Sequence, residues 1–249
     1  HISNSIDQKK DDVRKNVRIY GSLKKYLLKH IWRWAKRTIE KDEFKHNYSE
    51  YFVDKIIDGE KYVYFPLHLQ PEMTTDTLGG EYYDQLLAIE KLRKILPNDW
   101  KIYIKENPKQ KAYMRGRTFY SRLLSIDNIR LMSKNVNTYD LIRGCEFVAT
   151  IVGTAGWEAI SGGKSVLFFG NTWYKYFSGA TKYHDGVTVE EIMKNKPDHA
   201  IIEKQTFALQ KTLYNFYVGE YYETLNIEGN SNNIYEALSG TIANIENNK

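Results

Sequence analysis

From residue 61 to about residue 170, short apolar runs alternate with segments of helical periodicity, and this alternation restricts the fold more than any other feature. The apolar runs are rich in β-branched and aromatic residues and end in turn residues, which predicts strands at 61–66, 101–108, 129–132, 146–152 and 165–170. In the clearest intervening segment, residues 80–97, apolar residues recur every three or four positions until Pro97 stops the helix. Strands and helices that alternate in this way form a mostly parallel sheet covered by helices.

The predicted fold class is therefore α/β, a Rossmann-like parallel sheet with helices on both faces, plus helical N- and C-terminal segments. Further helices are expected after Pro108, Met132 and Val152, and again in residues 207–225 and 233–245. We expect three parts: a basic helical segment at 1–58, the sheet domain at 59–187, and C-terminal helices at 188–249 that pack on it. Six strand residues should point into the helix-covered layers: Tyr62, Tyr64, Ile102, Ile104, Val148 and Val166.

The stretch from Tyr20 to Arg37 is a candidate amphipathic helix. It contains no acid and six basic residues: Lys24, Lys25, Lys29, Arg33, Lys36 and Arg37. Apolar residues recur within it at helical spacing, at Tyr20, Leu23, Leu27, Ile31 and Trp34. Two interpretations stay open. The helix either lies on an anionic membrane surface, or it packs against its own protein or another domain.

Charge, hydropathy and cysteine content exclude several classes of protein. The net charge of +5 comes without a recognisable RNA-binding motif, so no nucleic-acid partner is expected. No run of about 18 apolar residues occurs and no signal pattern opens the sequence, which predicts a cytoplasmic protein. A peripheral position at the inner face of the cytoplasmic membrane stays open as an alternative. Cys145 is the single cysteine, which excludes an internal disulfide or a thiolate zinc cluster. No cofactor or metal is predicted.

The turn after the fourth predicted strand suggests an anion site. Gly153 and Gly156 let the chain turn sharply, and the helix that follows begins with free backbone N–H groups that favour a phosphate. Glu158 then lies in the first helical turn, where a carboxylate can accept hydrogen bonds from a ribose diol. The alternative is that the glycines only permit close packing and Glu158 only stabilises the helix dipole.

The same stretch carries a resemblance to a known family. "GTAGWEAISGGKSVLFFGNTWYKYFSGAT" (153–181) resembles the donor-binding segment of bacterial capsule polysaccharide synthesis proteins, the group that contains the Kdo transferases. "YFPLHLQPE" (64–72) is similar to the Gln-Pro element of that family, and "KENP" (105–108) stands where it has Lys-x-His-Pro, with Asn107 in place of the histidine. The resemblance covers about residues 61–185. It implies the donor-binding half of a GT-B glycosyltransferase that makes surface polysaccharide.

The resemblance also implies roles for individual residues. Its substrate-binding set is Gln70, Lys105, Asn107, Gly153, Thr154, Ala155, Gly156 and Glu158. In that reading Gln70 borders the donor and Lys105 neutralises its phosphate. The 153–156 turn then holds the phosphate on backbone amides while Glu158 contacts the ribose. The implied donor is a CMP- or UDP-linked sugar and the implied acceptor a saccharide or glycolipid; no catalytic residue is identified.

Other ionisable loop residues are expected to have no role in the chemistry. Glu72 and Glu106 read as solvated loop acids, and His68 and His184 as loop histidines whose hydrogen bonds are satisfied. Two further functions stay open. One is a non-catalytic nucleotide-binding or assembly module of the same fold, and the other is a nucleotide-sugar epimerase.

Overall fold

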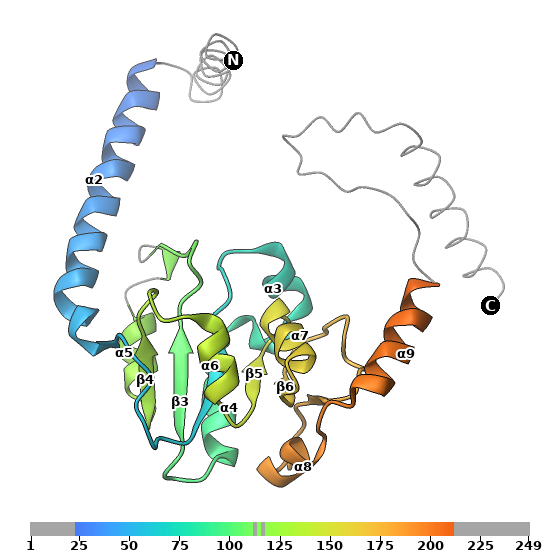
Figure 1. The fold of residues 1–249 in the computed structure, drawn as a ribbon. Helices are drawn as coiled ribbons and strands as arrows, with labels where there is room; N and C mark the ends of the chain where they lie inside the picture. The colour runs from blue at the N-terminus through green and yellow to red at the C-terminus, as the bar shows by residue number, and fades with distance from the viewer. Residues whose placement is uncertain (1–22, 112–113, 116–117, 212–249) are drawn as a thin grey trace, which may run out of the picture. The chain divides into compact units, whose positions relative to one another are not determined.

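The computed structural model describes residues 23–111, 114, 115 and 118–211 (Figure 1). The chain divides into two compact units, His1–Pro197 and Asp198–Lys249. The second unit is described only through helix α9 (His199–Gln210), so most of the predicted helix at 207–225 and all of that at 233–245 lie outside the described residues. The predicted division into three parts stays a prediction.

The first unit is built on a sheet of seven strands, all parallel, in the order β1-β4-β3-β2-β5-β6-β7. The strands are β1 (Phe52–Val53), β2 (Tyr62–Pro66), β3 (Lys101–Lys105), β4 (Ile129–Met132), β5 (Val148–Thr150), β6 (Val166–Phe168) and β7 (Ala180–Lys182). All five predicted strands form. The fold is the expected α/β Rossmann-like sheet, because each of these apolar runs is buried by a parallel neighbour and by covering helices.

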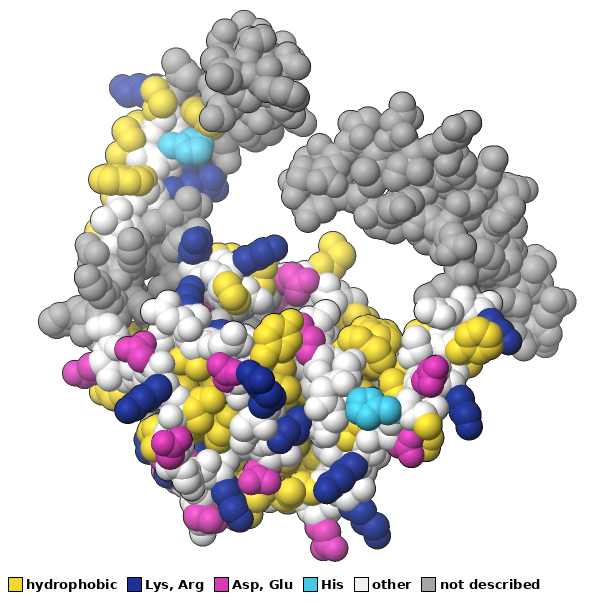
Figure 2. All heavy atoms as spheres, viewed as in Figure 1, with side chains coloured by type: hydrophobic (Ala, Val, Ile, Leu, Met, Phe, Trp, Pro, Cys, Tyr) yellow, Lys and Arg dark blue, Asp and Glu magenta, His cyan; other side chains and the backbone are white. Residues whose placement is uncertain are grey.

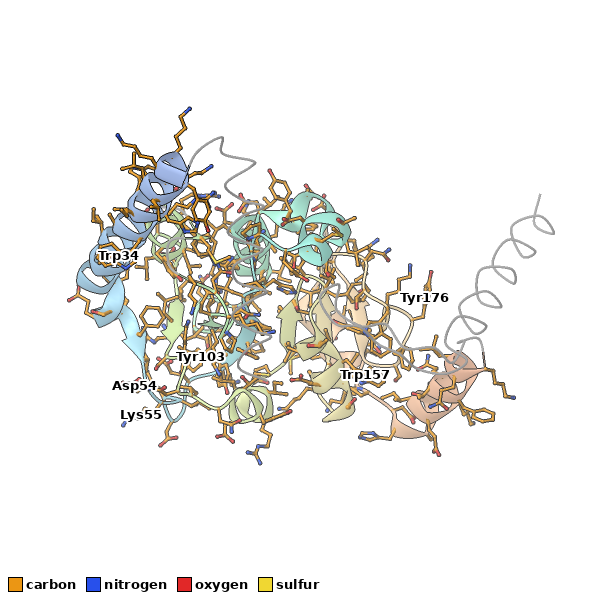
Figure 3. All side chains as sticks on the ribbon, turned by 90° about the horizontal axis from the view of Figure 1, so that it is seen from above. Trp34, Asp54, Lys55, Tyr103, Trp157 and Tyr176 are labelled. Carbon is orange, nitrogen blue, oxygen red and sulfur yellow. The ribbon has the colours of Figure 1, made fainter. Side chains whose placement is uncertain are left out.

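Helices cover both faces of the sheet (Figures 1 and 3). On one face α4 (Gln85–Ile95) and α5 (Phe119–Leu124) pack over the side chains of Val63, Phe65 and Ile104. On the other face lie α6 (Thr138–Gly144) and α7 (Thr154–Ser161), and the Tyr62 hydroxyl donates to the carbonyl of Leu141 in α6 at 2.9 Å. The six predicted core residues are all at most 2% exposed, which confirms that expectation.

The sequence did not predict the two edge strands. β1 has only two residues, and β7 is a partly exposed Ala-Thr-Lys segment, so neither contains a run of large apolar residues. Shorter elements complete the first unit: η1 (Ser49–Tyr51), α3 (Met73–Leu78), η2 (Gly80–Tyr83) and α8 (Val189–Lys194). Helices do follow Pro108, Met132 and Val152 as expected, and α6 starts at Thr138 because the Asn137 side chain caps it.

Helix α2 spans Leu23–Tyr48, so the predicted N-terminal helix exists, although its start at Tyr20 and the side chains of Lys36 and Arg37 lie outside the described residues. At its C-terminal end the ring of Tyr48 lies 5.4 Å from that of Tyr120 in α5. Within the described chain, every helix is too short or too polar to cross a bilayer.

Candidate functional site

The strand order places a switch point between β2 and β5. From β2 the chain continues outward to β3 and β4, and β5 then pairs with the opposite edge of β2. Parallel α/β sheets bind ligands at such a point, beyond the carboxyl ends of the strands. The loops that meet there follow β2 (residues 67–72) and β5 (residues 151–153). These are two of the three loops that the sequence singled out.

His68 joins these two loops. Its Nε2 accepts the backbone N–H of Val152 at 3.2 Å and lies 3.4 Å from Oγ1 of Thr150. Burial lowers the pKa of His68 to about 4, so the ring is neutral at pH 7. Because Nε2 accepts a hydrogen bond, the proton belongs on Nδ1. His68 thus has a partner at Nε2 but, among the described residues, none at its buried Nδ1, so the expectation that its hydrogen bonds are all satisfied is wrong.

The glycine turn opens α7 as the sequence indicated, but Glu158 is the fifth residue of the helix and lies beyond the first turn, where it was expected. Gly153 is the N-cap residue, and its carbonyl accepts the hydroxyl of Tyr174 at 2.7 Å and the N–H of Gly156 at 3.1 Å. A Cβ on Gly156 would stand 2.1 Å from the Tyr174 hydroxyl, so only glycine allows this approach. The N–H groups of Thr154 and Ala155 belong to the first helical turn, where no carbonyl of the helix can accept them.

Lys105 and Glu158 lie at the same end and on the same face of the sheet, connected through Thr138 and Tyr64. The buried ammonium of Lys105 donates to Oγ1 of Thr138 at 3.0 Å and to the carbonyl of Val136 at 2.5 Å. Thr138 also hydrogen-bonds the hydroxyl of Tyr64, whose pKa is raised by burial and by the charge of Glu158.

Lys105 and Glu158 each carry a charge without a counter-ion among the described residues. No described carboxylate forms an ion pair with Lys105, and burial lowers the pKa of its ammonium. Glu158 is half-buried, and among the described residues none donates a hydrogen bond to its carboxylate. An incoming phosphate and hydroxyl pair would satisfy both groups.

Gln70 and Asn107 are occupied by the protein itself. The Gln70 amide accepts from Gln85 Nε2 at 2.6 Å and from Arg115 Nη1 at 3.1 Å, and donates to the carbonyl of Tyr83 at 2.6 Å. The Asn107 side chain accepts the N–H of Lys109 at 2.9 Å and shapes the turn after β3. The structure thus groups Lys105, the 153–156 turn and Glu158 around the switch point. The side chain of Asn107 bonds within its own loop, whereas that of Gln70 bonds to Gln85, Arg115 and Tyr83.

Glu106 corrects one expectation, because it is buried and not solvated. Its carboxylate pairs with the guanidinium of Arg115 at 2.6 and 3.0 Å and accepts the hydroxyl of Tyr120 at 2.7 Å. Arg115 also donates to the carbonyl of His68 at 2.7 Å. This network connects the loop after β3 to the loop after β2. No local pattern in the sequence predicts it.

A cavity of about 580 Å³ lies beyond the carboxyl ends of β6 and β7, and none of the eight predicted residues lines it. Three aromatic rings form part of its wall. The ring centroids of Phe169 and Tyr183 are 4.7 Å apart in a stacked pair, and those of Tyr82 and Phe169 are 5.0 Å apart in an edge-to-face pair. Lys182 and His184 also line it, and Nε2 of His184 lies 3.3 Å from a carboxylate oxygen of Glu191. The N–H of Gly170 in its lining donates to the carbonyl of residue 151, directly after β5, at 2.9 Å.

Comparison with solved structures gives remote similarities. The chain is 16% identical to the β-Kdo 2,7 transferase of KpsC from Thermosulfurimonas dismutans over 62% of this chain and 56% of that one (TM-score 0.43). It is 14% identical to the UDP-GlcNAc 2-epimerase of Methanocaldococcus jannaschii over 63% of this chain and 47% of that one (TM-score 0.40). The chain therefore spans about half the length of these proteins. No curated protein matches it.

A family model matches a larger part of the chain than the solved structures do. The model of the capsule polysaccharide biosynthesis proteins matches residues 18–217, a range that contains the whole sheet and the switch point. This agrees with the family that the motifs of residues 61–185 resemble. The chain belongs to the capsule polysaccharide biosynthesis protein family.

Proposed function

We propose that this chain binds the nucleotide-sugar donor of a glycosyltransferase in capsule polysaccharide synthesis, as the donor-binding half of a GT-B enzyme. The observation that carries the proposal is the set of groups at the switch point: the free N–H groups that open α7, the Lys105 ammonium and the Glu158 carboxylate. A nucleoside diphosphate or monophosphate needs this combination of N–H donors, a cation and a carboxylate, because its phosphate is anionic and its ribose offers two hydroxyl donors.

Each group has a distinct part in the proposed chemistry. When the glycosidic bond to phosphate breaks, negative charge grows on the leaving phosphate, and the α7 amides and Lys105 stabilise that charge. Glu158 accepts from the ribose hydroxyls and positions the nucleotide. The donor is a CMP- or UDP-linked sugar and the acceptor a saccharide or glycolipid. Protein groups supply the electrophilic assistance in this proposal.

We assign the sugar part of the donor to the cavity beyond β6 and β7, although none of the eight predicted site residues lines it. Its volume of about 580 Å³ falls within the range of about 300 to 1,000 Å³ that is usual for small-molecule sites. Aromatic rings beside charged and amide side chains suit a polyhydroxylated ligand, which has both apolar faces and hydrogen-bonding edges.

A two-step experiment tests the proposal. A thermal-shift screen against CMP, UDP, GDP and dTDP first identifies the preferred nucleotide, since a ligand of the native state raises its stability. Calorimetric titration of Glu158→Gln then measures the ribose contact. Loss of one charge-assisted hydrogen bond, about 1.5 to 3 kcal/mol, should weaken nucleotide affinity by roughly 10- to 150-fold.

Glu190→Gln is the matched control, because Glu190 is an exposed helix glutamate of α8 and should leave affinity unchanged. A well-folded Glu158→Gln protein with wild-type affinity would refute the ribose contact. A protein that binds nucleotide but releases none from any nucleotide sugar in the presence of acceptor would favour the non-catalytic module of the same fold.

A further inference from the structure

Helix α2 presents a broad apolar surface to solvent. Six of its large apolar side chains are between 49% and 68% exposed: Leu27, Leu28, Ile31, Trp32, Trp34 and Ile39. Figure 2 shows apolar side chains gathered along one side of this helix, and Trp34 is labelled on it in Figure 3. Large apolar side chains exposed together on one element mark an interaction surface.

The helical spacing separates the apolar and basic residues of α2 into two faces. At about 100° per residue, the six apolar positions from Trp34 round to Trp32 span about 160° of the helix circumference. Lys25, Lys29 and Arg33 follow next to them, within about 80° on the opposite side. Lys24 is the exception, within the apolar half at the start of the helix, where its long stem can carry the ammonium outward.

We propose that α2 lies in the surface of an anionic lipid bilayer, with its apolar half inserted among the acyl chains. Trp and Leu on one face with Lys and Arg on the other is the composition of interfacial helices. Trp32 and Trp34 lie at opposite margins of the apolar half, where an indole ring reaches the headgroup level. This inference does not depend on the nucleotide site.

The charge pattern favours an anionic bilayer over a second copy of the chain. Residues 23–39 contain no Asp or Glu, so a second copy paired with them in parallel would offer no acidic partner to Lys25, Lys29 and Arg33. The apolar half is also wider than the narrow seam of a two-stranded coiled coil. An anionic lipid surface satisfies both features, because it accepts a wide apolar face and attracts lysine and arginine.

Vesicle flotation of the full chain is the test. We expect binding to vesicles of an equal mixture of phosphatidylcholine and phosphatidylglycerol, little binding to phosphatidylcholine alone, and weaker binding as salt rises from about 0.1 to 1 M. Lys25→Gln/Lys29→Gln/Arg33→Gln should weaken binding by about 100-fold. Lys55→Gln/Lys61→Gln/Lys194→Gln removes the same charge from exposed positions elsewhere and should bind as the wild type does.

A second pair of variants tests the apolar half. Leu27→Ala/Ile31→Ala/Trp34→Ala keeps helix propensity and should abolish flotation, whereas Met73→Ala/Tyr139→Ala/Tyr176→Ala, at other exposed apolar positions, should not. Brominated lipids should quench tryptophan emission, and Trp32→Phe/Trp34→Phe should lose that quenching and still float.

Several results would overturn the proposal: absence of flotation, equal flotation on neutral vesicles, wild-type binding by the two α2 triple variants, or quenching that persists in Trp32→Phe/Trp34→Phe. A dimer in sedimentation that the apolar triple variant dissociates, without vesicle binding, would assign the face to a second copy instead.

Discussion

At the scale of single residues, the buried pair of Glu106 and Arg115 has the largest expected effect on stability. Their side chains are 5% and 1% exposed, so neither charge can turn to water if the other is removed. We expect Glu106→Gln to lower the free energy of unfolding by about 3 to 5 kcal/mol, because it leaves the guanidinium buried without its counter-ion. Urea denaturation measures this difference.

The exposed pair of Asp140 and Arg143 supplies the control for that experiment. Asp140→Asn should change the free energy of unfolding by no more than about 1 kcal/mol, since surface pairs contribute little. Equal effects of the two substitutions would show that the Glu106 pair does not hold the two loops together.

The lowered pKa of His68 predicts how the free energy of unfolding depends on pH. Its pKa is about 4 in the folded protein against 6.5 as the ordinary value, so the unfolded chain takes up a proton first as pH falls. The stability associated with the neutral ring is complete above pH 6.5 and is lost progressively toward pH 4. At pH 5 the loss should reach about 2 kcal/mol, at 1.36 kcal/mol per unit.

Unfolding by urea at pH 7 and pH 5 measures this loss, and His68→Gln separates it from the titration of carboxylates. The variant should have a smaller difference between the two pH values by about the same 2 kcal/mol. An identical difference in wild type and variant would contradict the assignment of a neutral, buried His68.

At the scale of elements, the close contact of α7 with the loop after β6 can be tested by a clash and its relief. Gly156→Ala places a methyl group 2.1 Å from the Tyr174 hydroxyl and 2.7 Å from its ring carbon Cζ, so the ring must move and release the carbonyl of Gly153. We expect a loss of about 1 to 3 kcal/mol in thermal or urea unfolding.

Tyr174→Phe in the same chain removes the oxygen, the nearer of the two clashing atoms, and should recover part of that loss. Gly162→Ala is the matched control, because its Cβ would meet the Glu158 carbonyl oxygen at 3.3 Å and no side chain. Additive effects of Gly156→Ala and Tyr174→Phe would indicate that the two residues do not meet.

The elements also show what the sequence could predict. Five strands were predicted because each lies in a continuous apolar run, as expected of strands that are buried on both faces. The turn at Gly153 was predicted because glycine stands directly before a helix start. β1 has only two residues, and β7 (Ala180–Lys182) is partly exposed at the sheet edge, so neither contains such a run. The network of Gln70, Glu106 and Arg115 was missed because its members are up to 45 positions apart and meet only through the strand order.

At the scale of the whole molecule, the proposed nucleotide site and the proposed membrane helix α2 should act independently. The site groups lie at the switch point of the sheet, whereas the apolar residues of α2 are exposed along a separate helix. Two sites are coupled only if one ligand changes the equilibrium between states that the other distinguishes. We therefore expect the Kd of the preferred nucleotide to change by less than about twofold when anionic vesicles are added.

A variant of each site, measured for binding at the other site, tests this expectation. Glu158→Gln should float on anionic vesicles as the wild type does. Leu27→Ala/Ile31→Ala/Trp34→Ala should bind nucleotide with wild-type affinity, as measured by titration in the presence and absence of vesicles. Coupling is reciprocal, so a tenfold change in nucleotide affinity on vesicles would require an equal change in vesicle affinity with nucleotide. Such a pair of changes would mean that membrane binding remodels the switch point and would contradict independent action.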